Sequence, residues 1–506
     1  MKHQDPERRS HGKWYRGCWD AQFPRHRLAY ALPRITEGRQ LFQHLARRLR
    51  VNLLVRGTPE NNGAIDAVAR AVRPDPLAQL HSRAWRHASG GFGGNLVLML
   101  AGTALGQAAS VLLSPALTRV YTPDQFGYLG VYAAVLTILG VVAALGFDQA
   151  IPIARSIDEL ANLLASCAIA LAGTTIAVSL AAWLLPDSFL AALWLSPLAS
   201  YRTLVPIGFA CVGGYYVMVA AATRLSAFRH IAWTRISQGV SGPIAQIVLG
   251  LSGAGAPGLA IGFIVGQSSG TVMIFSRVLM AEPRLGTSAS WRGIRGVMLR
   301  YARFPLFASW ARVLDMAGGG SVLFLVFSAC YSPEIAGYMF LTERVIARPL
   351  LIVSTSLLQV FTGEAGQAVL QDPAMLRRRF WQVLPRQFAL AAGWIALANL
   401  AAGWAFPILF GQHWDASIPY LRALSVSYLA LAVLHPVSTL PQIMERQVMA
   451  ATWQVGRLIL VIASAIVAWQ LGWSALTALW LSALAQGVAC ATMLGLIAVA
   501  IQRFEQ

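Results

Sequence analysis

Residues 95–117 read NLVLMLAGTALGQAASVLLSPAL, 23 consecutive residues that include no charged side chain. At about 1.5 Å of rise per residue, a helix of this length crosses the roughly 30 Å of hydrocarbon in a bilayer. This stretch therefore predicts a membrane-spanning helix.

Eleven further apolar segments of similar length follow the first. The chain of 506 residues is 56% hydrophobic and only 12% charged, about half the charged share of a soluble protein. We predict an all-α polytopic membrane protein of about 12 transmembrane helices. The predicted spans are 94–117, 127–149, 160–185, 200–223, 233–253, 257–279, 303–329, 335–361, 384–409, 417–441, 448–471 and 474–501.

Two octapeptides repeat along the chain. Residues 121–128 read YTPDQFGY and residues 331–338 read YSPEIAGY, and each opens an apolar span. Proline suits the first turn of a helix, and the acid after it interacts favourably with the helix dipole. The octets match helices 1–2 to helices 7–8, which predicts two six-helix bundles. Parallel repeats of this kind enclose a central cavity in transporters that work by alternating access.

The predicted domains follow from this division. Residues 1–92 hold 17 Lys and Arg but 7 Asp and Glu, and are read as a disordered, basic cytoplasmic tail or as translation from a misplaced start. Residues 93–279 form the N-terminal six-helix bundle, 280–302 a cytoplasmic linker, and 303–506 the C-terminal six-helix bundle.

Arginine placement predicts the orientation. Sixteen arginines follow even-numbered spans, whereas Arg119, Arg202 and Arg422 lie near the opposite face. By the positive-inside rule, both termini of this multi-pass protein lie in the cytoplasm, as expected for a bacterial inner (plasma) membrane protein. Because the basic residues fall between apolar spans, they indicate membrane topology and not a nucleic-acid partner.

No catalytic or metal-binding motif is recognisable. The five cysteines are scattered without CxxC or Cys/His spacing, and there is no GxSxG, HExxH or nucleotide-binding GxxxxGK[ST] sequence. We therefore expect no metal, no cofactor and no catalytic residue, and a protein that is not an enzyme.

Charged residues inside predicted spans mark the candidate site, because charge in hydrocarbon is costly. Arg312 and Asp315 form an i,i+3 pair that could neutralise itself, and Glu343, Arg344 and Arg348 are predicted at similar depth on the next helix. Two alternatives stay open. The five residues form an ion-pair network that ties the two helices, or the surplus arginine binds an anion in a wet cavity.

Other charged residues are assigned to the ends of the passage. Arg119, Arg202 and Arg422 could guide or release the same anion, or lie at the interface by snorkelling. Asp148 could act in gating or ion coupling, together with Asp315 and Glu343, or lie at a solvated helix end.

Several stretches together resemble the bacterial polysaccharide repeat-unit flippases of the multidrug/oligosaccharidyl-lipid/polysaccharide exporter superfamily. The resemblance spans about 95–450. It rests on LSPALTRVYTPDQFG (113–127), DQAI (148–151), Phe304-Pro305, YSPEIAGY (331–338), TERV (342–345) with Pro349, and FGQHW (410–414).

This resemblance implies a function. It implies two six-helix bundles around a cationic cavity to which Arg119, Arg344 and Arg348 contribute. It implies translocation of undecaprenyl-pyrophosphate-linked oligosaccharide from the cytoplasmic to the periplasmic leaflet by alternating access, for O-antigen, capsule or exopolysaccharide biosynthesis. The implied partners are this lipid-linked glycan, membrane lipids, a polysaccharide polymerase and a chain-length regulator.

Other functions stay open. A multidrug cation exporter of the same superfamily should carry more acid than arginine in its spans. A membrane-embedded polysaccharide polymerase or ligase should carry a large outer loop with functional arginine and histidine. Lipid II flippases are related, but the predicted count of about 12 helices argues against them.

Overall fold

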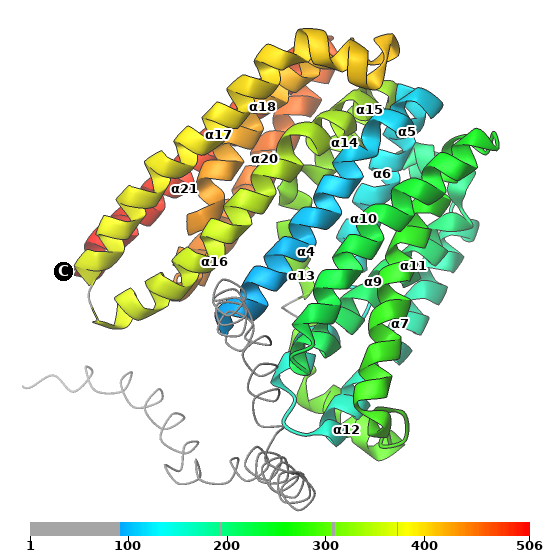
Figure 1. The fold of residues 1–506 in the computed structure, drawn as a ribbon, viewed down its shortest axis with the longest axis vertical. Coiled ribbons are helices and arrows are strands. Elements are labelled where there is room, and N and C mark those ends of the chain that lie inside the picture. Colours follow the sequence, from blue (N-terminus) through cyan, green and yellow to red (C-terminus); the bar gives the residue numbers. More distant parts are fainter. Residues whose placement is uncertain (1–91, 193–194, 306–308, 372, 506) are drawn as a thin grey trace, which may run out of the picture. The chain divides into compact units, whose positions relative to one another are not determined.

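The structure, a computed structural model, describes residues 92–192, 195–305, 309–371 and 373–505. The predicted tail at 1–92 lies outside the described residues except for Phe92. Every regular element in the described ranges is a helix (Figure 1). The prediction of an all-α polytopic membrane protein is confirmed.

The first half of the described chain makes six passes. They are α4 (Phe92–Leu112) with α5 (Ser114–Val120), α6 (Pro123–Gly140) with the 3-10 turn η2 (Phe147–Ile153), α7 (Ile157–Leu184), α9 (Leu204–Arg224), α10 (Phe228–Leu251) and α11 (Gly255–Ala281). Short elements connect them: α8 (Asp187–Ala192), η3 (Ser196–Tyr201), η4 (Pro283–Gly286) and α12 (Trp291–Arg300).

The second half also makes six passes, and the first two are interrupted by π-helical turns. They are α13 (Ser309–Met316) with η6 (Ala317–Ser321) and α14 (Val322–Cys330), α15 (Pro333–Thr342) with η7 (Glu343–Ala347) and α16 (Arg348–Gln371), α17 (Pro373–Phe410), α18 (Ser417–Leu434) with η9 (His435–Val437) and α19 (Leu440–Ile443), α20 (Gln447–Gln470) and α21 (Ala475–Glu505). The short turn η8 (Gln412–Trp414) joins α17 to α18.

Eight of the described passes are helices long and apolar enough to cross a membrane by length and composition alone. The other four passes do not meet these length and hydropathy criteria, for local reasons. The first turn of α6 is polar, α10 carries arginine and glutamine side chains, and the passes through η6 and η7 are broken into shorter helices. Interrupted helices of this kind recur where proteins bend or bind.

Close backbone packing organises the first half around α10, which contacts both α4 and α11. A Cβ atom at Gly239 would lie 2.0 Å from the carbonyl oxygen of Gly106 on α4. On the other side, Gly262 of α11 lies against Gln246. The glycines Gly106 of α4 and Gly262 of α11 are therefore packing positions, as small residues in membrane helices usually are.

The two octapeptides meet each other in space. Each begins a helix, α6 or α15, with a side-chain cap from Thr122 or Ser332. A Cβ at Gly127 would lie 1.7 Å from the Pro333 carbonyl oxygen, and a Cβ at Gly337 would lie 1.8 Å from the Pro123 carbonyl oxygen. Such reciprocal contacts are what a twofold relation between the two halves requires.

Aromatic side chains surround this contact. Trp414 is fully buried, and its indole donates a 3.0 Å hydrogen bond to the carbonyl oxygen of Thr118 in the opposite half. The rings of Phe126 and Tyr338 approach Trp414 edge-on at 4.9 and 6.1 Å. The interface between the halves is therefore closed at this end, where α5, α6, α14 and α15 lie together in Figure 1.

Alanine at Gly127 or Gly337 should weaken this closed end, because backbone carbonyl oxygens cannot move far enough to admit a Cβ. We expect each variant to lose about 1–3 kcal/mol of stability, measured by thermal unfolding in detergent. Gly173→Ala on α7 is the control, since no atom lies within 4 Å of its added Cβ. Equal unfolding temperatures for all three variants would contradict the reciprocal contact.

Candidate functional site

Arg344 lies in the π-helical turn η7 and is only 8% exposed. Its guanidinium carbon is 5.4 Å from the ring centre of Phe340 and 5.9 Å from that of Phe126, which belongs to α6 of the other half. Its Nη1 atom has no hydrogen-bond partner within the described part of the chain. Cation–π contacts offset only part of the cost of burying such a charge.

Arg348 lies one turn further along the same pass and joins the two halves. It donates a 3.0 Å hydrogen bond to Gln107 Oε1 on α4. Its Nη2 atom is 3.6 Å from Glu343 Oε1, a partly exposed ion pair. Glu343 of the same pass therefore neutralises Arg348 through Nη2, while Nη1 of Arg348 contacts the opposite half.

Arg312 on α13 also joins the halves, through Asp148 of the other half. Its Nη1 atom donates a 2.6 Å hydrogen bond to Asp148 Oδ2 in η2, and its guanidinium lies 5.9 Å from the Tyr216 ring on α9. The side chain of Asp315 lies outside the described residues. Asp148 is buried, with 6% of its surface exposed, and does not lie at a solvated helix end.

The arginines are spread along the passes, and Arg348, 15 residues from the start of α15, lies between Arg344 and Arg312. Arg344 lies 11 residues after Pro333, where α15 begins at the closed end. Arg312 lies 18 residues before Cys330, where its own pass ends at the closed end. At about 1.5 Å per residue, these positions are roughly 17 and 27 Å from the closed end. Within the described residues, no hydrogen bond or ion pair connects Arg312 to Arg344, Arg348 or Glu343.

Three further arginines lie near the closed end, apart from Arg312, Arg344 and Arg348. Arg119 is exposed and donates a 3.3 Å hydrogen bond to the carbonyl oxygen of Ile408 on α17. Arg202 forms an ion pair with Asp187 on the short helix α8. Arg422 is exposed on α18.

Sequence reasoning missed two further arginines by counting them with the loops. Arg235 lies within α10, and its guanidinium is 5.2 Å from the ring of Tyr215, the neighbour of Tyr216 in sequence. Arg457 lies within α20, is 6% exposed, stacks on Trp453 at 4.8 Å and donates to Gln454. Gln107 was also missed, although a glutamine in the middle of an apolar span was a visible signal.

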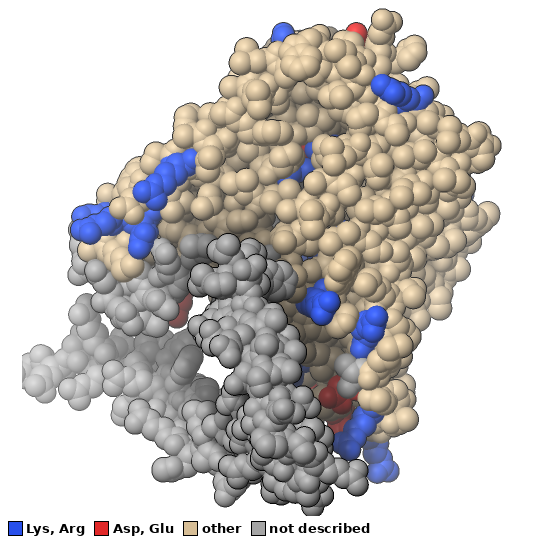
Figure 2. All heavy atoms as spheres, in the orientation of Figure 1, with Lys and Arg blue, Asp and Glu red and all other residues tan. Residues whose placement is uncertain are grey.

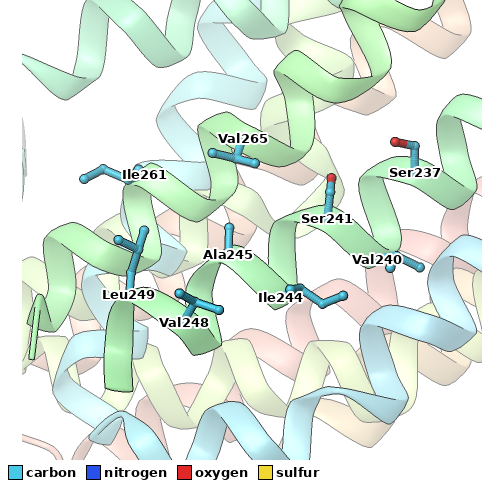
Figure 3. Close-up of a pocket in the computed structure, with 9 residues that line it drawn as sticks. All are labelled: Ser237, Val240, Ser241, Ile244, Ala245, Val248, Leu249, Ile261 and Val265. Atoms are coloured by element: carbon cyan, nitrogen blue, oxygen red, sulfur yellow. The ribbon is translucent and has the colours of Figure 1, made fainter. Parts of the chain in front are cut away.

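One surface groove has no charged residue in its lining. A groove of about 670 Å³ runs along α10 and α11 (Figure 3). Its hydroxyl groups bond to the protein, since Ser241 Oγ is 2.9 Å from Ser269 Oγ. The remaining lining is aliphatic: Val240, Ile244, Ala245, Val248, Leu249, Ile261 and Val265. This surface suits hydrocarbon and offers nothing to a charged group.

The charged site suits an anion between the halves. Arg312 and Arg348 have carboxylate partners, whereas Arg344 forms no ion pair with any described residue. Guanidinium groups bind phosphate oxygens through paired hydrogen bonds. No group of three or more metal-ligating side chains occurs in the described chain.

Solved structures define the class of this fold. Lipid II flippase MurJ in an inward closed conformation is 11% identical with a TM-score of 0.60, and the match covers 81% of this chain and 89% of MurJ. An outward-facing multidrug resistance MATE family transporter of the MOP superfamily is 16% identical with a TM-score of 0.51, covering 81% of this chain and 96% of that chain. A MATE protein in a bent conformation is 15% identical with a TM-score of 0.51, covering 83% and 98%. The chain therefore shares its fold with these membrane proteins.

The family follows from the sequence itself. Residues 116–419 match the polysaccharide biosynthesis protein family, and the chain belongs to this family. The matched range includes both octapeptides, Arg312 and Arg344. No curated protein matches the chain in sequence.

Removing either member of the Arg312–Asp148 pair should destabilise the protein, because each leaves a buried charge unmatched. We expect Asp148→Asn and Arg312→Gln each to cost about 1–3 kcal/mol, and the double variant to cost less than their sum. The measurement is unfolding in detergent. The control is the exposed pair Arg202–Asp187, whose loss should cost less than about 1 kcal/mol. Strictly additive effects at Arg312 and Asp148 would contradict the coupling.

Proposed function

We propose that this protein is a flippase for undecaprenyl-pyrophosphate-linked oligosaccharide repeat units in O-antigen, capsule or exopolysaccharide biosynthesis. The substrate moves unchanged from the cytoplasmic to the periplasmic leaflet of the inner membrane, so the protein is not an enzyme. A polysaccharide polymerase and a chain-length regulator act after it. The family membership and the arginines between the halves support this proposal.

The observation that carries the proposal is the unmatched charge of Arg344. An unpaired cation at 8% exposure in a membrane protein costs several kcal/mol. Two aromatic rings hold the guanidinium in place without neutralising it. Such a group is expected where a negatively charged ligand neutralises it during the transport cycle, as a pyrophosphate would.

The arrangement of the halves supports alternating access. The octapeptide contact and the Trp414 cluster close one end, while Arg348 and Arg312 bridge the halves through Gln107 and Asp148. An anion that binds these arginines competes with both bridges. Binding would thereby weaken the bridges between the halves at these arginines. The halves could then move relative to each other, and the octapeptide contact at the closed end could separate.

The direction of transport rests on the orientation of the chain. We propose that the closed end faces the periplasm and that both termini lie in the cytoplasm, since the basic loops gather at the opposite end. The structure then represents a state closed to the periplasm. Arg119, Arg202 and Arg422 would lie near the exit, and Asp148, Asp315 and Glu343 are the candidates for ion coupling.

The alternative of a multidrug cation exporter is less well supported by the same observation. A site for cations needs unpaired acid, whereas Asp148 and Glu343 are each engaged by an arginine. If the protein were a polymerase or ligase, the unmatched Arg344 between the two repeats would have no role. The flippase is therefore our conclusion.

Arg344→Gln should abolish transport, because the uncharged amide cannot neutralise pyrophosphate. We expect at least a tenfold loss of polymer export in a strain that depends on this protein, with lipid-linked repeat units accumulating on the cytoplasmic face. Arg344→Lys should retain part of the activity, since an ammonium keeps the charge but loses the paired hydrogen bonds.

The matched control is Arg378→Gln, which removes an exposed arginine from the first turns of α17. Protein amount and unfolding temperature are measured for each variant. Wild-type export by a well-folded Arg344→Gln protein would overturn the site. Repeat units that accumulate on the periplasmic face in a deletion strain would instead indicate a polymerase.

A further inference from the structure

The short helix α12, in the segment that joins the halves, is fixed on the protein by one face. Ile294 and Val297 are buried at 8% and 7% exposure, and α12 packs on α7. The backbone N–H of Ser290 donates a 3.0 Å hydrogen bond to Asn162 Oδ1 of α7. The rotation of α12 about its axis is therefore set by these contacts.

The opposite face of α12 combines exposed apolar and basic side chains. Trp291 is 74% exposed and Leu299 is 70% exposed, while Arg292 and Arg295 are also exposed. At 3.6 residues per turn, these four residues lie within about 100° of arc on the helix surface. A tryptophan and a leucine among arginines on one face are typical of helices at a membrane surface.

The charge around this face is strongly positive. Residues 277–303 carry six arginines and one acid, Glu282. Arg300 is matched by Glu159 of α7 at 3.1 Å, whereas Arg292 and Arg295 form no ion pair with any described residue. The exposed Asp158 is a further acid on the first turn of α7. Figure 2 shows basic side chains gathered at this end of the molecule.

We propose that the exposed face of α12, defined by Trp291, Arg292, Arg295 and Leu299, binds the headgroups of anionic phospholipids in the adjacent leaflet. The two guanidinium groups meet the phosphate oxygens, and the indole and leucine side chains enter the boundary with the acyl chains. Charge complementarity selects an anionic lipid, and the exposed apolar side chains select a lipid over free phosphate. Bound lipid thereby holds the linker between the halves at the membrane surface.

This site is independent of the proposed transport activity, and its test needs no transport assay. The full-length protein is reconstituted in nanodiscs that contain equal amounts of phosphatidylglycerol and phosphatidylethanolamine. The lipids that remain bound after transfer to a neutral detergent are counted by native mass spectrometry. We expect wild-type protein to retain phosphatidylglycerol preferentially.

Arg292→Gln with Arg295→Gln should lower this preference at least about fivefold, the contribution expected of one basic residue at an anionic surface. The matched control is Arg378→Gln with Arg503→Gln, which removes two exposed arginines from α17 and α21 and should keep the preference. Trp291→Ala should lower the retention of both lipids without changing the charge.

Three outcomes would overturn the proposal. They are unchanged preference in the Arg292/Arg295 variant, an equal loss in the control, or displacement of the lipid by millimolar inorganic phosphate. The unfolding temperature in neutral detergent verifies that each variant is folded. Should the double variant fail to fold, the preference of the wild-type protein is measured against salt, and retention that does not fall with salt also overturns the proposal.

Discussion

The contact between the start of α6 and the start of α15 constrains the rest of the structure. Each glycine, Gly127 and Gly337, lies against the backbone carbonyl of the proline that begins the other helix, so no side chain fits between them. This contact fixes the relative position of the halves at one end. The aromatic cluster around the fully buried Trp414 and the bond from Arg119 to α17 follow from that position. A transporter that alternates access has to break such a contact. Because this contact consists of backbone and aromatic rings, breaking it separates no ion pair.

Electrostatic cost organises the interior beyond this contact. Arg312 and Arg348 have partners drawn from both halves, so the charges that bridge the interface are largely matched. Arg344 is held by rings and remains unmatched. In a medium of low dielectric constant, a cation in this state attracts an anion over a longer range than it would in water. The interior thus holds two arginines with carboxylate partners, Arg312 and Arg348, and one without a described carboxylate partner, Arg344.

Charged and aliphatic surfaces lie in different parts of the structure. The charged residues lie between the halves, whereas the groove on α10 and α11 is aliphatic and its hydroxyl groups bond to the protein. The face of α12 adds a basic surface at the end opposite the octapeptide contact. Arg235 and Tyr216 lie near Arg312, so basic character extends from this end toward the interior.

The sequence alone determined the class of fold, the apolar spans and the repetition of the octapeptides. Apolar length and repeated helix starts such as Thr122-Pro123 and Ser332-Pro333 are local properties that need no partner. It also identified Arg344 and Arg348 as intramembrane charges. Only the tertiary structure decided that Asp148 pairs with Arg312, that Gln107 contacts Arg348, and that Arg235 and Arg457 lie against aromatic rings. The partner of a buried charge depends on which distant helices pack beside it, since Asp148 and Arg312 are 164 residues apart, and no local pattern encodes that distance.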